Sequence, residues 1–174
     1  NVMYFDFRGC GQSPRHGLCS LGFYERHDLE AAIRWVKDNK SQQAQFLGIY
    51  GLSMGGVAAL ASGAGNCAKL IDAVAIESSF AGFYDVVASY VKLAHSLPAF
   101  PFADVFVGLL RWRTGWVDHE SASPRESLKR FSVPRLLMIY GSQDRLVSVI
   151  VFRELEALAR RLQGVRVETW LCPG

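Results

Sequence analysis

The sequence predicts an α/β fold: one domain built on a mostly parallel sheet with helices on both faces. Short apolar runs alternate with amphipathic segments along the chain, and this alternation is typical of parallel sheets. The chain has 174 residues, of which 50% are hydrophobic and 20% are charged. That composition can bury a core and excludes a disordered chain, and the length suits one domain over residues 1–174.

Five short apolar runs are the expected strands. They are rich in aliphatic and aromatic residues and are bounded by glycine, proline or polar loops, as strands are. A proline opens the fourth run, at the position where a strand tolerates it best. The five runs are Val2–Phe7, Phe46–Tyr50, Ile71–Ile76, Pro134–Tyr140 and Val165–Leu171.

Helical segments are expected between these strands. Residues 23–38 repeat apolar side chains three and four positions apart, with charged residues between them. A helix of small residues is expected over Val57–Ala64, and residues 149–162 carry a second apolar stripe. Because helices that alternate with strands connect them in parallel, the sheet is expected to be mostly parallel.

The stretch from Phe80 to Lys129 contains no strand-like run and interrupts the alternation. Its first part, from Phe80 to Trp116, holds nine of the chain's 21 aromatic residues. Such an excursion either makes a small core of its own or roofs a pocket with its apolar face, and the sequence leaves both open. Residues 80–129 are therefore expected to form a cap inserted in the domain.

The charge and the cysteines exclude several classes of protein. A net charge of +3, with the charged residues scattered, does not indicate a nucleic-acid-binding protein. No run reaches the roughly 20 apolar residues that a membrane-spanning helix needs. The four cysteines lie far apart without metal-ligand spacing, so neither a metal site nor a disulfide framework is expected. Free thiols favour a reducing compartment such as the cytoplasm.

The sequence Gly51-Leu52-Ser53-Met54-Gly55 stands between an expected strand and an expected helix. A serine on such a tight turn lies above the sheet edge, and flanking glycines let the neighbouring backbone approach closely. The first N–H groups of the helix stabilise a developing oxyanion. We therefore predict that Ser53 is a catalytic nucleophile and that the N–H of Met54 is an oxyanion donor. A glycine-rich turn with a chance serine is the alternative.

A serine nucleophile needs a general base and a carboxylate that orients the base. Asp144 follows the fourth expected strand and so reaches the same edge of the sheet as Ser53. Glu77 and Asp85 follow the third expected strand and are the competing carboxylates. We predict that Asp144 is the acid.

Three motifs together resemble signatures of the α/β-hydrolase superfamily. The chain is most similar to the serine-aminopeptidase-like and dienelactone-hydrolase-like branches with a short cap, and the resemblance covers nearly all of it. It implies the α/β-hydrolase fold and hydrolase chemistry. The motifs are Asp6-Phe7-Arg8-Gly9-Cys10-Gly11-Gln12-Ser13, the GLSMGG sequence around Ser53, and Gly141-Ser142-Gln143-Asp144-Arg145-Leu146-Val147.

The resemblance also implies parts that lie outside residues 1–174. The family's base is a histidine after the last strand, so the resemblance places it beyond Gly174. The first strands, the last helix, the second oxyanion donor and a strand between Val2–Phe7 and Phe46–Tyr50 are likewise expected outside the chain. No histidine of the chain occupies the family's place, and His119 is the first to test as a substitute. The four histidines are His16, His27, His95 and His119.

The resulting hypothesis is a serine hydrolase that cleaves a small-molecule ester, amide or peptide through an acyl-enzyme on Ser53, without a metal or organic cofactor. The aromatic cap favours a substrate with an apolar acyl or aryl group. A non-catalytic binding protein and an acyltransferase of the same fold are the alternatives. Residues 1–174 alone are expected to be inactive and to aggregate through open sheet edges.

Overall fold

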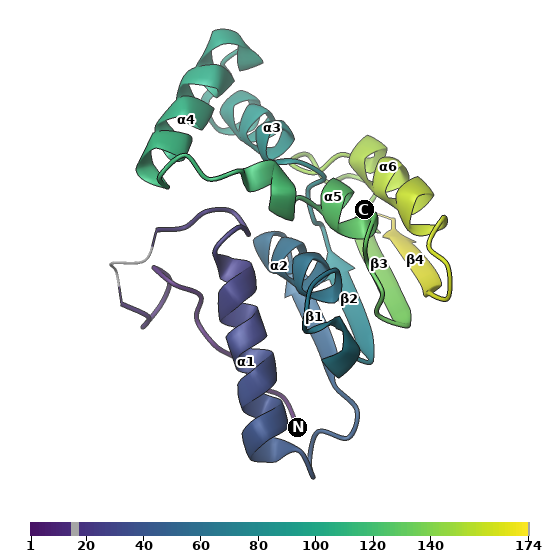
Figure 1. Cartoon of the computed structure of the whole chain (residues 1–174). Coiled ribbons are helices and arrows are strands. Elements are labelled where there is room, and N and C mark those ends of the chain that lie inside the picture. The colour runs from purple at the N-terminus through teal and green to yellow at the C-terminus, as the bar shows by residue number, and fades with distance from the viewer. Residues whose placement is uncertain (15–17, 174) are drawn as a thin grey trace.

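The computed structural model describes residues 1–14 and 18–173 and contains a parallel sheet of four strands. Their order across the sheet equals their order in the sequence, and each neighbouring pair is parallel (Figure 1). This confirms the last four expected strands, with bounds shifted by one or two residues. The strands are β1 (Gly48–Leu52), β2 (Ala73–Glu77), β3 (Arg135–Gly141) and β4 (Arg166–Cys172).

The helices that alternate with these strands lie on one face of the sheet (Figure 1). Helix α2 is buried from Gly56 to Gly63, between the sheet and α1, so its small residues allow close packing on both sides. Two short 3₁₀ turns, η1 (Ala68–Leu70) and η2 (His119–Ala122), lie in the connections. The helices on this face are α1 (Glu25–Lys40), α2 (Met54–Gly63), α5 (Pro124–Leu128) and α6 (Val149–Ala159).

Alternate side chains of the strands form one main hydrophobic cluster with these helices. In β2 and β3 every second residue is buried because successive side chains of a strand point to opposite faces. Burial of side chains of this size contributes roughly 1.5–3 kcal/mol each, so this cluster is the principal source of stability. Its largest members include Leu60, Ile76, Leu136, Met138 and Tyr140.

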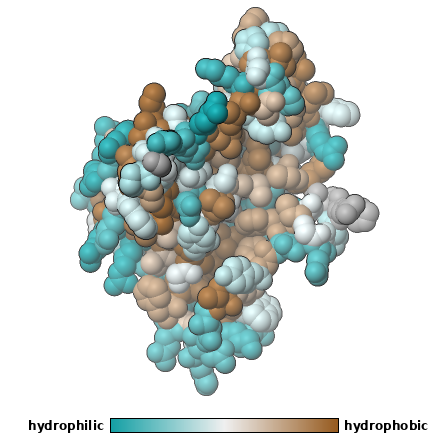
Figure 2. Space-filling view, turned by 180° about the vertical axis from the view of Figure 1, so that it is seen from behind, coloured by the Kyte–Doolittle hydropathy of each residue, from teal (hydrophilic) through white to brown (hydrophobic). Residues whose placement is uncertain are grey.

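The other face of the sheet is open among the described residues, which corrects the expectation of helices on both faces. Tyr50 of β1 and Trp170 of β4 point to this side and are 62% and 59% exposed. Figure 2 shows the molecule from behind, and hydrophobic (brown) and pale side chains occupy the middle of that view. The reason is topological: every described helix that follows β1, β2 or β3 returns on the same side, or stands away from the sheet.

The first expected strand is absent. Val2–Phe7 has no regular secondary structure, and Tyr4 within it is 90% exposed. An extended segment becomes a strand only when a neighbour accepts and donates its backbone hydrogen bonds, and no described strand lies beside it. The segment therefore leaves β1 as an edge of the sheet. The loop after it is attached to α1 by Arg8, whose Nε donates to Asp28 at 2.9 Å.

A helical hairpin occupies most of the expected cap. It consists of α3 (Phe83–His95) and α4 (Ala99–Arg113), and it stands out beyond the sheet (Figure 1). Of the two possibilities that the sequence leaves open, the hairpin does make its own small core. The rest of the expected cap, η2 and α5, packs against α2 of the main body. Leu128 of α5 belongs to the main cluster, and Ala122 of η2 is buried. The core residues of the hairpin are Phe83, Val87, Val91, Ala103 and Val107.

Candidate active site

Ser53 forms the turn between β1 and α2 with an unusual backbone conformation. Its φ of 51° and ψ of −115° lie where residues other than glycine are strained. The surrounding backbone holds this conformation: the Ser53 N–H donates to the carbonyl of Glu77 at 2.8 Å. The Ser53 carbonyl accepts from the N–H groups of Gly56 and Val57 at 2.9 and 3.2 Å. These hydrogen bonds therefore offset the strain of the Ser53 backbone.

Two glycines make this turn possible. A Cβ added to Gly51 would lie 2.3 Å from the backbone of Gly55, and one added to Gly56 would lie 1.9 Å from the Ser79 Oγ. At Gly51 the obstacle is backbone, so that position requires glycine. At Gly56 a side chain would displace the Ser79 hydroxyl, which donates to the Ser53 carbonyl. A Cβ added to Gly55 would meet nothing within 4 Å. The close approach expected of the flanking glycines therefore belongs to Gly51 and Gly56, and Gly55 is free to vary sterically.

The Ser53 hydroxyl does not cap α2 and has no hydrogen-bond partner among the described residues. It is partly exposed. Met54 is the first residue of α2, so its N–H has no carbonyl within the helix to donate to. The turn thus places an unbonded hydroxyl beside a helix N-terminus with free N–H donors, where negative charge is stabilised.

Ser79 and Tyr140 support this turn, and the sequence alone does not reveal their roles. The Ser79 hydroxyl donates to the Ser53 carbonyl at 3.0 Å, and the Tyr140 hydroxyl donates to the Ser79 carbonyl at 2.6 Å. Burial raises the pKa of Tyr140, so its phenol stays protonated as a donor. The only signal in the sequence is the position of both residues at the carboxyl ends of strands.

Asp144 lies at the edge of the sheet that also carries Ser53. Because β1, β2 and β3 are parallel neighbours, their carboxyl ends share one edge, and β3 ends at Gly141. Two strand spacings, about 10 Å, separate the ends of β1 and β3. The Asp144 Oδ1 accepts N–H groups from Leu146 and Val147, each at 2.9 Å, which fixes the carboxylate in its loop.

The two competing carboxylates have other partners. Glu77 accepts a hydrogen bond from the Tyr50 hydroxyl, and this bond raises the pKa of Tyr50. Asp85 forms an ion pair with the Arg125 guanidinium, at 2.7 Å between Oδ2 and Nη1. Arg125 also binds Glu154 of α6, so Asp85 belongs to a junction between the hairpin and the main body. These partners make Asp144 the stronger of the three candidates.

His119 is buried in η2, with 4% of its surface exposed. Its ring stacks on Phe83 with 4.1 Å between ring centroids, and its Nε2 lies 3.2 Å from the Thr114 hydroxyl. Burial lowers the pKa of His119, and its Nδ1 has no hydrogen-bond partner among the described residues. This environment is that of a packing residue at the base of the hairpin.

The other histidines have different surroundings. His27 lies on α1 with its Nδ1 3.6 Å from Glu30, and His95 lies at the exposed end of α3. His16 lies outside the described residues. Among the described residues, no hydrogen bond, ion pair or ring contact joins a histidine to Ser53 or Asp144.

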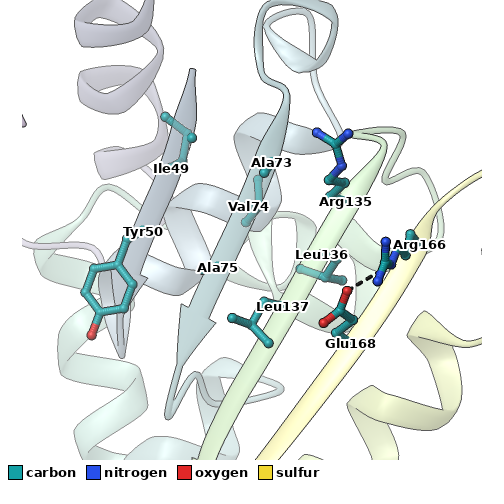
Figure 3. A pocket seen from close by; sticks show the side chains of 11 residues that line it. Ile49, Tyr50, Ala73, Val74, Ala75, Arg135, Leu136, Leu137, Arg166 and Glu168 are labelled. Carbon is teal, nitrogen blue, oxygen red and sulfur yellow. Dashed lines mark ion pairs between the residues drawn. The ribbon is translucent and has the colours of Figure 1, made fainter. Parts of the chain in front are cut away.

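The open face of the sheet contains a shallow hollow of about 390 Å³ (Figure 3). Tyr50, Ala75 and Leu137 line it, and an ion pair of 2.9 Å between Arg166 and Glu168 closes one side. A second hollow, of about 370 Å³, lies between α1 and α2. Neither is lined by Ser53 or by the hairpin, so neither is the pocket expected under a cap.

Two sulfur atoms lie in contact at the start of α2. The Cys19 Sγ lies 3.6 Å from the Met54 Sδ, which brings the loop before α1 against the start of α2. Among residues 1–14 and 18–173, no group of three or more histidine, cysteine or acidic side chains could hold a metal ion.

Comparisons with known proteins match the whole chain. Residues 1–174 match the family described as "Alpha/beta hydrolase family". An uncharacterized protein of Bacillus subtilis, YqkD, is 31% identical over 149 residues, which are 86% of this chain and 48% of that protein. The chain therefore spans about half the length of this relative.

Solved structures share the fold. The Pyrococcus furiosus esterase Pf2001 aligns with a TM-score of 0.72 and 24% identity, over 97% of this chain and 60% of that one. The Thermogutta terrifontis esterase 2 aligns with a TM-score of 0.62 and 20% identity, over 92% of this chain and 56% of that one. A serine hydrolase homologue from Coxiella burnetii aligns with a TM-score of 0.55 and 21% identity, over 97% and 56% of the two chains. With the family match over its full length, the chain belongs to the alpha/beta hydrolase family.

Proposed function

We propose that the protein is a serine hydrolase that cleaves a carboxylic ester through an acyl-enzyme on Ser53. The observation that carries the proposal is the strained Ser53 backbone, which holds an unbonded hydroxyl at the N-terminus of α2. A fold that keeps a serine in this conformation only for packing would be unusual, because strain of this kind clusters at functional sites.

The reaction follows from the groups at the turn. The Ser53 Oγ attacks the carbonyl carbon while a base accepts the hydroxyl proton, and the Met54 N–H donates to the oxyanion that forms. The alcohol leaves with that proton, and water then hydrolyses the acyl-enzyme. Asp144 orients the base, which we assign to a histidine beyond Gly174 because His119 is buried and stacked.

The esterases among the solved structures that share the fold support this substrate class. The Thermogutta terrifontis esterase 2 has been solved phosphoramylated by tabun and with butyrate bound. Together with the Pyrococcus furiosus esterase Pf2001, it favours an ester over an amide or peptide.

The test is hydrolysis of a p-nitrophenyl ester by a longer form of the protein that continues past Gly174. Ser53→Ala is expected to lower kcat by about 10³-fold or more, and Asp144→Asn by roughly 10²- to 10⁴-fold. Glu77→Gln is the matched control and is expected to stay within about threefold. Equal losses for Asp144→Asn and Glu77→Gln would contradict the choice of acid.

Residues 1–174 alone are expected to show no turnover. Turnover by this chain that depends on Ser53 would contradict the assignment of the base, and His119→Phe would then be the next variant to assay.

A further inference from the structure

Helix α4 exposes a row of large apolar side chains that no other described segment covers. The spacing of three and four residues places the row on one face of the helix. A neighbouring face, with Ala103 and Val107, packs on α3, and α4 has no comparable contact with any other described helix or strand. The row is Phe102, Val105, Phe106 and Leu109, which are 42, 60, 41 and 58% exposed.

The carboxyl end of this row carries a cation and two indole rings. Arg113 lies four residues after Leu109 and therefore continues the same face. Trp112 and Trp116 stand beside it and are 69% and 68% exposed. Arg111 lies on roughly the opposite side of the helix, since two residues rotate the face by about 200°.

Apolar surface on both sides of one helix is unusual for a helix that meets water. A surface helix normally shows charged residues outward, and a helix that is apolar all round is covered by protein or lipid. Asp104 is the one acidic residue of α4, and the Tyr84 hydroxyl donates to it at 3.3 Å. Among the described residues no single helix is long and apolar enough to cross a membrane, but α3 and α4, bent by 117°, pass that test as a pair.

We propose that the exposed row of α4 docks on an anionic lipid surface, with the helix in the plane of the headgroups. Phe106 and its neighbours enter the acyl boundary, and Trp112 and Trp116 lie at headgroup level, where indole rings partition best. Arg113 reaches lipid phosphates from the end of the row. This inference does not depend on the proposed hydrolase activity.

Charge complementarity favours lipid over a second copy of the chain. A partner with the same row would bury the Arg113 guanidinium against apolar side chains without an acceptor, which is costly. The headgroup region supplies phosphates at the depth where the guanidinium lies. Lys92 near the end of α3 and Arg111 of α4 are also exposed, so the hairpin carries three exposed cations together with Arg113.

The experiment is flotation of the protein with unilamellar vesicles, equimolar in phosphatidylcholine and phosphatidylglycerol or made of phosphatidylcholine alone. Binding is expected to be tighter to the anionic vesicles and to weaken as salt is raised. Phe106→Glu is expected to weaken binding about tenfold or more, because an apolar anchor becomes an anion. Arg113→Gln is expected to weaken it about fivefold.

Two matched variants separate this face from general stickiness. Trp35→Glu changes an aromatic residue of α1 that is 48% exposed, and Arg111→Gln removes a charge from the same turn but the other side of α4. Both are expected to bind vesicles within about twofold of the unchanged protein. Circular dichroism checks that all four variants fold.

Three outcomes would overturn the proposal. They are no binding to anionic vesicles at low salt, equal losses in Phe106→Glu and Trp35→Glu, and a dimer that Phe106→Glu makes monomeric while no form binds vesicles. The last outcome would assign the row to a second copy of the chain.

Discussion

The main body and the α3–α4 hairpin differ in how their apolar residues are buried. Among the described residues, the main cluster gathers 23 buried residues from the sheet, its helices and the connecting segments, whereas the hairpin buries five between two helices. The hairpin joins the body mainly at its base, where His119 stacks on Phe83 and Arg125 pairs with Asp85. The Ser53 turn rests on the larger cluster, so its strained backbone has many packed neighbours. The smaller cluster of the hairpin does not include any residue of that turn.

The largest difference is expected for truncation of a core side chain in each region. Leu60→Ala removes a fully buried side chain of α2 and is expected to lower the free energy of unfolding by about 3–5 kcal/mol. Val107→Ala in the hairpin is expected to cost only about 1–2 kcal/mol, because fewer atoms surround it. Urea denaturation measures both values, and equal losses would show that the two clusters form one cooperative core.

Two neighbouring glycines of the turn are expected to differ in how they tolerate a side chain. Gly56→Ala is expected to destabilise by about 2–4 kcal/mol, since the new Cβ meets the Ser79 hydroxyl. Gly55→Ala, one position earlier in the same helix, meets nothing within 4 Å and is expected to be neutral or stabilising by up to about 1 kcal/mol. Thermal unfolding of the two variants is the measurement. Similar destabilisation by both would contradict the steric account of the turn.

The smallest expected effect is a pH dependence at the base of the hairpin. Burial lowers the pKa of His119 in the folded protein, so the unfolded chain binds the proton more readily. Stability is therefore expected to fall as the pH drops below about 6.5, the usual pKa of a histidine. The charges of Glu120 and Asp118 raise the pKa of His119, whereas the charge of Arg111 lowers it further.

His119→Phe keeps an aromatic ring against Phe83 and removes the titrating group. Denaturant midpoints at about pH 8 and about pH 5.5 are expected to converge for this variant. His95→Gln, at the exposed end of α3, is the control and is expected to keep the pH dependence. A dependence that survives in His119→Phe would assign it to other groups.

The sequence predicts most of the alternating strands and helices well because the pattern of each lies within its own residues. The run Pro134–Tyr140 and its following loop show a buried strand and a carboxylate at its end without reference to any neighbour. Val2–Phe7 shows the same local signal, and its prediction was wrong because a strand also needs a partner that the sequence does not display. The open face of the sheet was missed for the same reason.

The support of the turn could not be predicted because it depends on residues far apart in the chain. Ser79 and Tyr140 are 61 positions apart, and their hydrogen bond exists only after β2 and β3 have paired. The roles of Ser53, Met54 and Asp144 stay predictions, supported by where the fold places them. The distinction between Gly55 and Gly56 likewise required the position of Ser79.

Covalent labelling reveals whether Ser53 is the nucleophile. A form of the protein that continues past Gly174 is treated with a fluorophosphonate probe, and the labelled peptide is located by mass spectrometry. We expect one phosphonylated residue, Ser53, with labelling lost in Ser53→Ala and retained in Ser79→Ala at a reduced rate. A label on any other serine, or labelling that persists in Ser53→Ala, would contradict this assignment.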